Sequence, residues 1–255
     1  MDRFFYKITK KVVYFTRKKK DTVMKCSTLF VLFAMFSSFL FSQSILETHD
    51  PAKTLTAEKC YDVIKTVWDG LMKLSDEYQI EAADKNEFES TAEYNTRIQK
   101  CKDNHINKIR KFFSDNKLNS REYSVWMKAE LVKYDADNQT YSIKSPTQIL
   151  TQPKKNAIAV TVPSNKYLTI TEKNSGGYRR AFLHLNTNPE FTWFVNKQTA
   201  QEAKNNEQNI FFKLSFTFDI SFNETEHQIV LQIVPKKLSL MNQGDNFTFW
   251  SEDIH

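Results

Sequence analysis

The chain has 255 residues, of which 40% are hydrophobic and 14% aromatic, so it can bury a substantial core and is not an intrinsically disordered protein. Its net charge of +6 comes from the first 44 residues, which carry nine of the 36 basic and two of the 30 acidic side chains. The remaining 27 basic and 28 acidic residues make the body nearly neutral, which excludes nucleic acid as an expected partner.

An uncharged apolar run lies at residues 27–41, preceded by Lys25. Its fifteen residues are fewer than the roughly twenty that a membrane-spanning helix needs. Ser42 and Ser44 follow with the spacing of the small residues at a signal-peptidase site. We therefore expect residues 1–44 to be a cleaved signal peptide and the body to be exported, to the periplasm, the outer envelope or the medium. The alternative is an uncleaved N-terminal membrane anchor, which the positive-inside rule orients in the same way.

Met24 is a second candidate start of the protein. The 23 residues before it are long for the basic beginning of a signal peptide, whereas the sequence from Met24 has ordinary signal-peptide proportions. In that case residues 1–23 are a spurious N-terminal extension. With either start, the leader is the only expected link between this protein and a membrane.

A linker at residues 45–55 leads to the first helical pattern. Thr56 is the expected N-cap, because Glu58 follows in the first turn and apolar residues then recur every three or four positions. These observations predict a helix over about residues 57–80. Its apolar face is formed by Cys60, Ile64, Val67, Leu71, Leu74 and Tyr78.

The second helical pattern begins after a polar, acid-rich connection. Ser90 or Thr91 is the expected cap, and the helix is predicted to run to about Phe113. We expect the two helices to pack as an antiparallel hairpin within residues 56–118. The apolar face of the second helix is formed by Tyr94, Ile98, Cys101, Ile109, Phe112 and Phe113.

Two cysteines of an exported chain, Cys60 and Cys101, suggest a disulfide bond. A hairpin that turns near residue 86 separates them by about ten helical residues, or roughly 15 Å, which is too far for a bond. A pair of buried free thiols is therefore the alternative to the disulfide. Cys101 and His105 are spaced as half of a zinc site, but no second pair accompanies them, so no metal is expected.

The residues from Lys85 to Arg97 read KNEFESTAEYNTR, and a second run, YDADNQTYSI, begins at Tyr134. The sequence resembles uncharacterised exported bacterial proteins that carry a D-E-F-E-T-T-x-E-Y-x-x-R-like run in a domain of unknown function. The resemblance implies export and an α+β domain, but no activity. Its characteristic positions in this chain are Phe88, Glu89, Thr91, Tyr94 and Arg97.

The same residues also read as the entry to a helix. In this interpretation Thr91 caps the helix, Phe88 packs back against its first turn, and Glu93 pairs with Arg97 four residues later. Carboxylates at the start of a helix are commonly solvated, so we assign them a structural rather than a catalytic role.

From Arg121 onward the apolar period changes from 3.6 towards 2, which predicts β-strands. Turn signals at residues 135–138 and 173–177 separate some of these strands. A short helix is expected over residues 198–207, capped by Thr199 or Asn196. The first strands are predicted at residues 123–132, 140–144, 157–162, 166–172, 178–185 and 192–195.

Residues 210–222 give the most informative strand pattern, because every second side chain from Ile210 to Phe222 is large and apolar. Residues 228–234 are expected to pair with this strand as a hairpin and to end at Pro235. Residues 238–241 and 247–250 are expected to add a last edge.

The order of the elements predicts the fold class. Strands and helices do not alternate, so the sheet should be mainly antiparallel rather than parallel. We predict an α+β fold in which the helical hairpin packs on a mainly antiparallel β-sheet of about seven or eight strands. Residues 119–255 are expected to form this β-rich region, in one domain with the helices.

Known catalytic and cofactor motifs are missing from the sequence. It has no G-x-S-x-G, Walker, G-x-G-x-x-G, H-E-x-x-H or C-x-x-C pattern, so no catalytic residue, metal or cofactor is assigned. Tyr178, Arg180 and His184 share one face of a predicted strand and are a candidate binding surface for a carboxylate or a sugar. The alternative is a solvated face on which arginine stems lie across aromatic rings.

These features favour an exported, non-enzymatic protein with a binding or envelope-structural role, whose partner is an envelope protein or a small ligand. One alternative is a secreted hydrolase with a dispersed active site, which needs His184 or His227 in a pocket beside a carboxylate or hydroxyl. Another alternative is a membrane-anchored subunit of an envelope complex, which needs an uncleaved leader.

Overall fold

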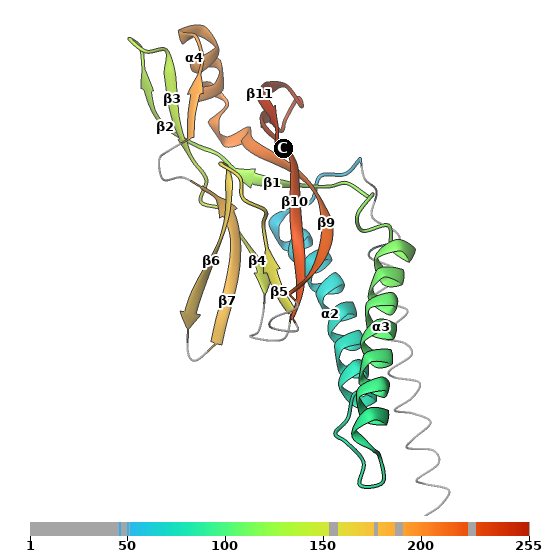
Figure 1. Ribbon diagram of the computed structural model, residues 1–255. Coiled ribbons are helices and arrows are strands. Elements are labelled where there is room, and N and C mark those ends of the chain that lie inside the picture. Colours follow the sequence, from blue (N-terminus) through green and yellow to red (C-terminus); the bar gives the residue numbers. More distant parts are fainter. Residues whose placement is uncertain are drawn as a thin grey trace, which may run out of the picture. The chain divides into compact units, whose positions relative to one another are not determined.

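Figure 1 shows the computed structural model of the protein. It describes residues 46, 50, 52–152, 158–175, 178–186, 191–223 and 228–254. The chain divides into two units, Met1–Thr48 and His49–His255, and nearly all the described residues belong to the second. The apolar run at 27–41, Ser42, Ser44 and His227 lie outside the described residues. Within the described part, no helix is both long and apolar enough to cross a membrane.

The fold of the second unit is α+β, as predicted, with a helical hairpin and a short third helix. Its eleven described strands form three sheets rather than one sheet of seven or eight. Only β5 and β10 pair in parallel among the described strands. The first sheet contains β1 (Tyr123–Lys128), β9 (Ile210–Asn223), β10 (Gln228–Asn242), β11 (Thr248–Asp253) and β5 (Ile158–Thr161). The second contains β2 (Glu130–Asp135), β3 (Thr140–Lys144) and β8 (Phe191–Phe194), and the third β4 (Gln148–Gln152), β7 (Tyr178–Leu185) and β6 (Leu168–Ser175).

The predicted strand over residues 123–132 is divided between two sheets. β1 pairs with β9, and the chain then leaves the first sheet at Ala129 so that β2 pairs with β3 in the second. A bulge between Leu131 and Lys133 accompanies the change of partner. The alternating pattern continues through the break without glycine or proline, so the sequence contains no signal for it.

The β9–β10 hairpin was predicted correctly, but β10 is longer than expected. Phe218 pairs with Ile233 and Leu214 with Leu238, so the ladder continues beyond Pro235 to Asn242. A bulge between Pro235 and Lys237 accommodates the proline, which has no N–H to donate. Pro235 therefore marks an irregularity in the strand and not its end.

Both long helices begin with side-chain caps. α2 (Ala57–Glu81) is capped by Thr56, whose Oγ1 accepts a hydrogen bond from the Lys59 N–H at 3.3 Å. α3 (Thr91–Asp115) is capped by Ser90, which forms a reciprocal capping box with Glu93. The short α4 (Lys197–Asn205) is capped by Asn196. These local signals confirm three helices close to their predicted bounds, and the interpretation of Thr91 as a cap is wrong.

The two long helices form an antiparallel hairpin whose connection, residues 82–90, is centred on residue 86, but they do not pair in the register that a symmetric turn there would give. The rings of Tyr78 and His105 stack with centroids 4.7 Å apart, and Cys101 Sγ lies 3.5 Å from the Glu81 carbonyl oxygen. Cys101 therefore lies beside Glu81, which is 21 residues further along α2 than Cys60. This spacing corresponds to about 30 Å along the helix axis. Both cysteines are free, and Cys60 is fully buried.

Gly70 and Phe112 bring the helices close together. A Cβ atom added at Gly70 would lie 2.5 Å from Phe112 Cζ, which is inside any normal contact distance. The missing side chain thus makes room for the aromatic ring. A glycine that costs helix stability by itself is here a requirement of the helix packing.

α2 lies between α3 and the strands (Figure 1), in contact with β1, β4 and β5. Its last buried residue is Ser75, and α3 buries only Ile109 and Phe113. The part of the hairpin beyond Ser75 therefore extends past the core and contacts mainly itself. The core face of α2 consists of Cys60, Val63, Ile64, Val67, Trp68 and Leu71.

The centre of the first sheet is aromatic. The ring of Phe216 lies 5.8 Å from that of Tyr123 and 5.5 Å from that of Phe218, and all three side chains are fully buried. The apolar face of β9 is thus part of the core, although Ile220 and Phe222 at its far end are only half-buried. Phe212, Phe216 and Phe218 of this strand are core residues.

Candidate functional site

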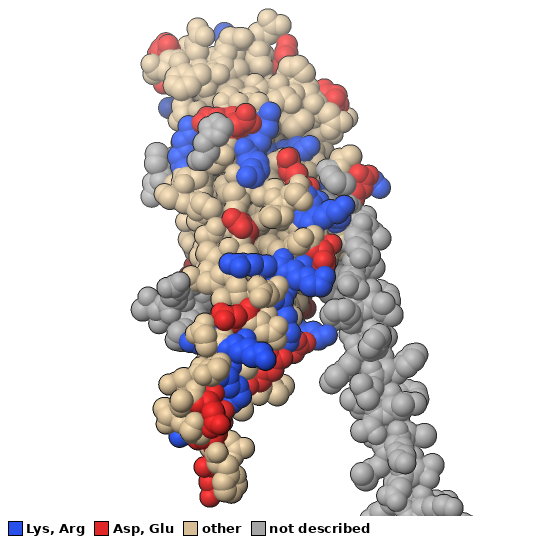
Figure 2. Space-filling model, turned by 45° about the vertical axis from the view of Figure 1, so that its right-hand side comes forward, with Lys and Arg blue, Asp and Glu red and all other residues tan. Residues whose placement is uncertain are grey.

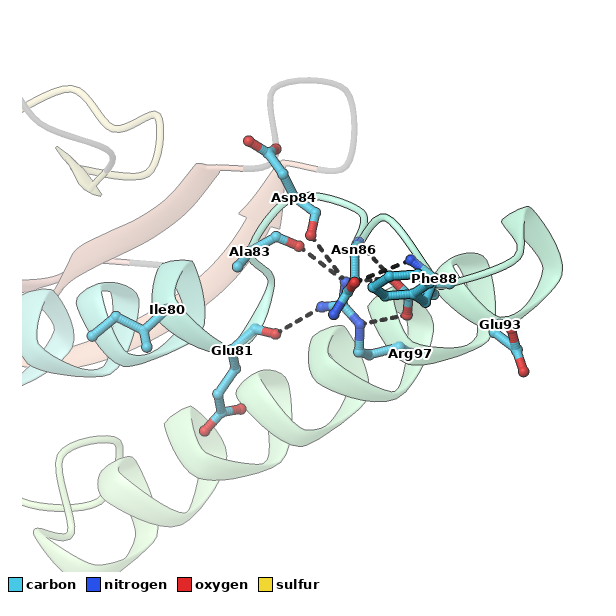
Figure 3. Close-up of a pocket in the computed structure, with 9 residues that line it drawn as sticks. Ile80, Glu81, Ala83, Asp84, Asn86, Phe88, Glu93 and Arg97 are labelled. Carbon is cyan, nitrogen blue, oxygen red and sulfur yellow. Dashed lines mark hydrogen bonds and ion pairs between the residues drawn. The ribbon is translucent and has the colours of Figure 1, made fainter.

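The hairpin tip, which we define as residues 80–97, holds an open pocket of about 660 Å³ (Figure 3). Two apolar side chains at its edge face water: Phe88 is 90% exposed and Ile80 is 78% exposed. Phe88 was expected to pack against the first turn of α3, and that prediction is wrong. The pocket is lined by Ile80, Glu81, Ala83, Asp84, Asn86, Phe88, Glu89, Glu93 and Arg97.

Arg97 organises the loop between the two helices. Its Nε and Nη2 donate to the two carboxylate oxygens of Glu89, at 2.8 and 3.0 Å. Its Nη1 donates to the carbonyl of Glu81 at 3.1 Å, and Nη2 also contacts the carbonyls of Ala83 and Asp84, at 3.1 and 3.4 Å. These carbonyls lie at the end of α2, where helix groups lack intrahelical partners and a positive charge is favourable.

The expected ion pair between Glu93 and Arg97 does not form. Glu93 Oε2 accepts the Ser90 N–H at 2.8 Å instead, because the capping box directs this carboxylate towards the helix start. The hydrogen bonds from Arg97 lower the pKa of Glu89, and those from Ser90 lower the pKa of Glu93. Both carboxylates are therefore charged at neutral pH.

Glu89 and Asn86 hold Phe88 in its exposed position. The second carboxylate oxygen of Glu89 accepts the Asn86 N–H at 3.2 Å, and the Asn86 side chain accepts the Phe88 N–H at 3.1 Å. Figure 3 shows Phe88 beside Asn86 in the loop. The polar network thus fixes the backbone that carries Phe88 and leaves its ring in water.

The charge at the hairpin tip is negative. Residues 80–97 hold five acidic and two basic side chains, and Figure 2 shows acidic groups among uncharged ones at the lower end of the molecule. Lys85 Nζ donates to Thr91 Oγ1 at 3.2 Å. Among the described residues, no cation lies within ion-pair distance of Asp84 or Glu87. The rim of the pocket therefore offers carboxylates to a ligand.

A second polar cluster, next to the tip, connects α2 and α3. Lys108 Nζ contacts the carboxylates of Glu81 and Glu77, at 2.8 and 3.4 Å. His105 stacks on Tyr78, and its Nδ1 is buried without a hydrogen-bond partner in the described part of the chain. Burial, with a smaller repulsion from Lys108, lowers the pKa of His105.

The binding surface proposed from the sequence lies on β7, away from this pocket. Ala181, Leu183 and Leu185 are buried, so the alternation of the strand places Arg180 and His184 on the opposite face. The side chain of Tyr178 lies outside the described part of the chain.

Both ring nitrogens of His184 have partners. Its Nδ1 is 3.0 Å from the Leu185 carbonyl oxygen, which requires the proton on that nitrogen, and its Nε2 is 3.1 Å from Thr171 Oγ1. On the same face, Lys173 Nζ lies 5.4 Å from the centre of the Phe182 ring and 2.9 Å from Gln148 Oε1. The structure thus brings Arg180 and His184 to one face, where the Leu185 carbonyl and the Thr171 hydroxyl are the partners of the His184 ring.

The hairpin tip contains the residues that carry the sequence resemblance, yet sequence reasoning did not identify it as a site. Arg97 lies 5.3 Å from the centre of the Tyr94 ring and bonds to Glu89, so three of those positions form one cluster. A phenylalanine within an acidic run, Phe88, was the available signal. Among the described residues, no group of three or more histidine, cysteine or acidic side chains is arranged to hold a metal ion.

Comparison with known proteins gives no match to this chain, whether with family models, curated proteins or solved structures.

Proposed function

We propose that this protein is an exported, non-enzymatic binding protein that docks a partner protein of the cell envelope through its hairpin tip. The observation that carries the proposal is the 90% exposure of Phe88 in a loop fixed by Arg97 and Glu89. Burying a phenylalanine side chain stabilises a protein or a complex by about 1.5–3 kcal/mol. Because the polar network keeps this ring exposed, the free energy gained by burying it is available to a contact with another protein.

Two further observations support this proposal. The hairpin extends beyond the core after Ser75, so its tip can reach a partner without steric hindrance from the three sheets. Ile80 lines the same pocket as Phe88, at its other end, so the pocket offers a second exposed apolar side chain. The export of the protein rests on the leader at residues 1–44.

The test compares two exposed phenylalanines. The full-length protein is purified from its native envelope as the wild type, as Phe88→Ser and as Phe194→Ser, because Phe194 is 79% exposed on β8 and lies outside the tip. We expect a partner protein to co-purify with the wild type and with Phe194→Ser, and to be lost from Phe88→Ser. Equal recovery with both variants, or no partner with any of them, contradicts the proposal.

A further inference from the structure

From the charges around Phe88, we infer that the docked partner presents a basic segment, in which a lysine or arginine lies next to an apolar side chain. This inference rests on the proposed docking function and names the chemistry of the partner. It follows from three properties of the pocket: its arginine is engaged by groups of its own chain, the net charge of the tip is negative, and its exposed ring can accept a cation.

The engagement of Arg97 by its own chain disfavours an anionic ligand. An arginine in a pocket is ordinarily a binding group for a carboxylate or a phosphate. Arg97 instead makes five hydrogen bonds, all to groups of its own chain, and two of them form a bidentate pair with Glu89. This pair neutralises its charge, and most of its donors are directed into the loop, so its attraction for a negative group from outside is weak.

The free charges of the tip favour a cation. The net charge of residues 80–97 is −3, whereas the chain after residue 44 is close to neutral. Asp84 lines the pocket, and Glu87 precedes Phe88 in the sequence. In the described part of the molecule neither carboxylate has a cationic partner within ion-pair distance, so both are available to a basic side chain.

The ring of Phe88 fits the same ligand. An aromatic face attracts an ammonium or guanidinium group within about 6 Å, and the attraction increases when carboxylates lie nearby. An apolar side chain next to that cation can cover the ring edge and Ile80. A basic segment thus satisfies the carboxylates and the two exposed apolar side chains together.

A membrane surface is the main competing occupant, because exposed phenylalanine and isoleucine side chains can enter a bilayer. Bacterial and eukaryotic leaflets with anionic lipids repel a tip of negative charge, and membrane-binding surfaces are typically rich in lysine and arginine. The −3 charge of the tip therefore favours a basic protein segment over a lipid surface.

The test uses photo-crosslinking in the native cells. The full chain carries p-benzoyl-phenylalanine in place of Phe88 or, as a control, in place of Phe194, and the cross-linked peptides are sequenced by mass spectrometry. We expect residue 88 to capture one protein segment that residue 194 does not, with lysine or arginine within about three positions of the attachment site. In the Asp84→Asn/Glu87→Gln background, the yield should fall roughly threefold or more, because two weak ion pairs are lost.

The matched control for charge is Glu122→Gln/Asp137→Asn, which neutralises two exposed carboxylates outside the tip and should leave the yield unchanged. A captured segment without basic residues, or equal yields in the two neutralised backgrounds, overturns the basic-segment inference and leaves docking intact. Cross-links to lipid alone overturn it in favour of membrane binding. No capture by residue 88 above the level of residue 194 overturns both proposals.

Discussion

Arg97 binds the carboxylate of Glu89 through two hydrogen bonds of 2.8 and 3.0 Å, across a loop and a helix start that separate them by eight residues. The remaining hydrogen bonds of this guanidinium are to the carbonyl of Glu81 at the end of α2 and to those of Ala83 and Asp84 in the connection that follows. This pair converts a polar nine-residue connection into a fixed platform for Phe88. The predictions below follow from this arrangement and from the hairpin that supports it.

Arg97→Ala should loosen the hairpin tip without unfolding the core. The variant loses the bidentate pair and the contacts to the end of α2, so backbone amides of residues 82–90 should exchange hydrogen about tenfold faster. Hydrogen exchange followed by mass spectrometry measures this directly. Arg110→Ala, an exposed arginine on the same helix, is the control and should leave the exchange of the loop unchanged. Equal exchange in the two variants contradicts the role assigned to Arg97.

Gly70→Ala should destabilise the protein, although alanine is the better helix former by about 1 kcal/mol. The added Cβ would lie 2.5 Å from Phe112 Cζ, and displacing the ring should outweigh the propensity gain, for a net loss of about 1–2 kcal/mol. Urea denaturation measures the change. In a Phe112→Ala background the steric conflict is absent, and Gly70→Ala should then stabilise by about 1 kcal/mol. Stabilisation in both backgrounds contradicts the close packing of the helices.

Phe216→Ala should cost about 3–5 kcal/mol of unfolding free energy, because it removes a fully buried ring that contacts Tyr123 and Phe218. Thermal or chemical unfolding provides the value. Phe194→Ala, which removes an exposed ring, should change the stability by less than about 0.5 kcal/mol. A stable Phe216→Ala protein with a selective binding defect would mean that β9 forms a ligand site.

The hairpin should lose stability in mild acid through His105. Burial lowers its pKa in the folded protein below the ordinary value of 6.5, so folding favours the neutral ring. The contribution of His105 is therefore complete above about pH 6.5 and is lost as the pH falls through the folded pKa. Nearby Glu77 and Glu81 oppose this shift, and Lys108 adds to it.

The measurement compares the free energy of unfolding from pH 7 to pH 5 in the wild type and in His105→Phe, which keeps an aromatic ring on Tyr78 but does not titrate. The wild type should lose more stability over this interval than the variant. The other histidines are common to both proteins, so their difference isolates His105. Parallel pH profiles would contradict the prediction.

The sequence predicted the elements that depend on neighbouring residues. Thr56 caps its helix through a hydrogen bond to a backbone group three residues away, as predicted, and Ser90 and Asn196 were each one of two proposed caps. The strand at 210–222 was clear because its alternation extends over thirteen residues. Such signals need no knowledge of the tertiary structure.

Features that depend on distant partners were missed. The chain changes sheets at Ala129 because β1 pairs with β9 and β2, which follows it, pairs with β3. The continuation of β10 past Pro235 needs a bulge. Helical spacing places only Glu93 within reach of Arg97, and the loop conformation brings Glu89, eight residues away, to it instead. The exposure of Phe88 follows from that same loop, so it was not visible in the sequence pattern.

The most direct test of partner docking is the affinity of the co-purified partner for three purified proteins: the wild type, Phe88→Ser and Phe194→Ser. If Phe88 is the central docking residue, its replacement should weaken binding by at least about tenfold, whereas Phe194→Ser should bind like the wild type. An unchanged dissociation constant for Phe88→Ser would contradict the assignment of the hairpin tip as the docking site.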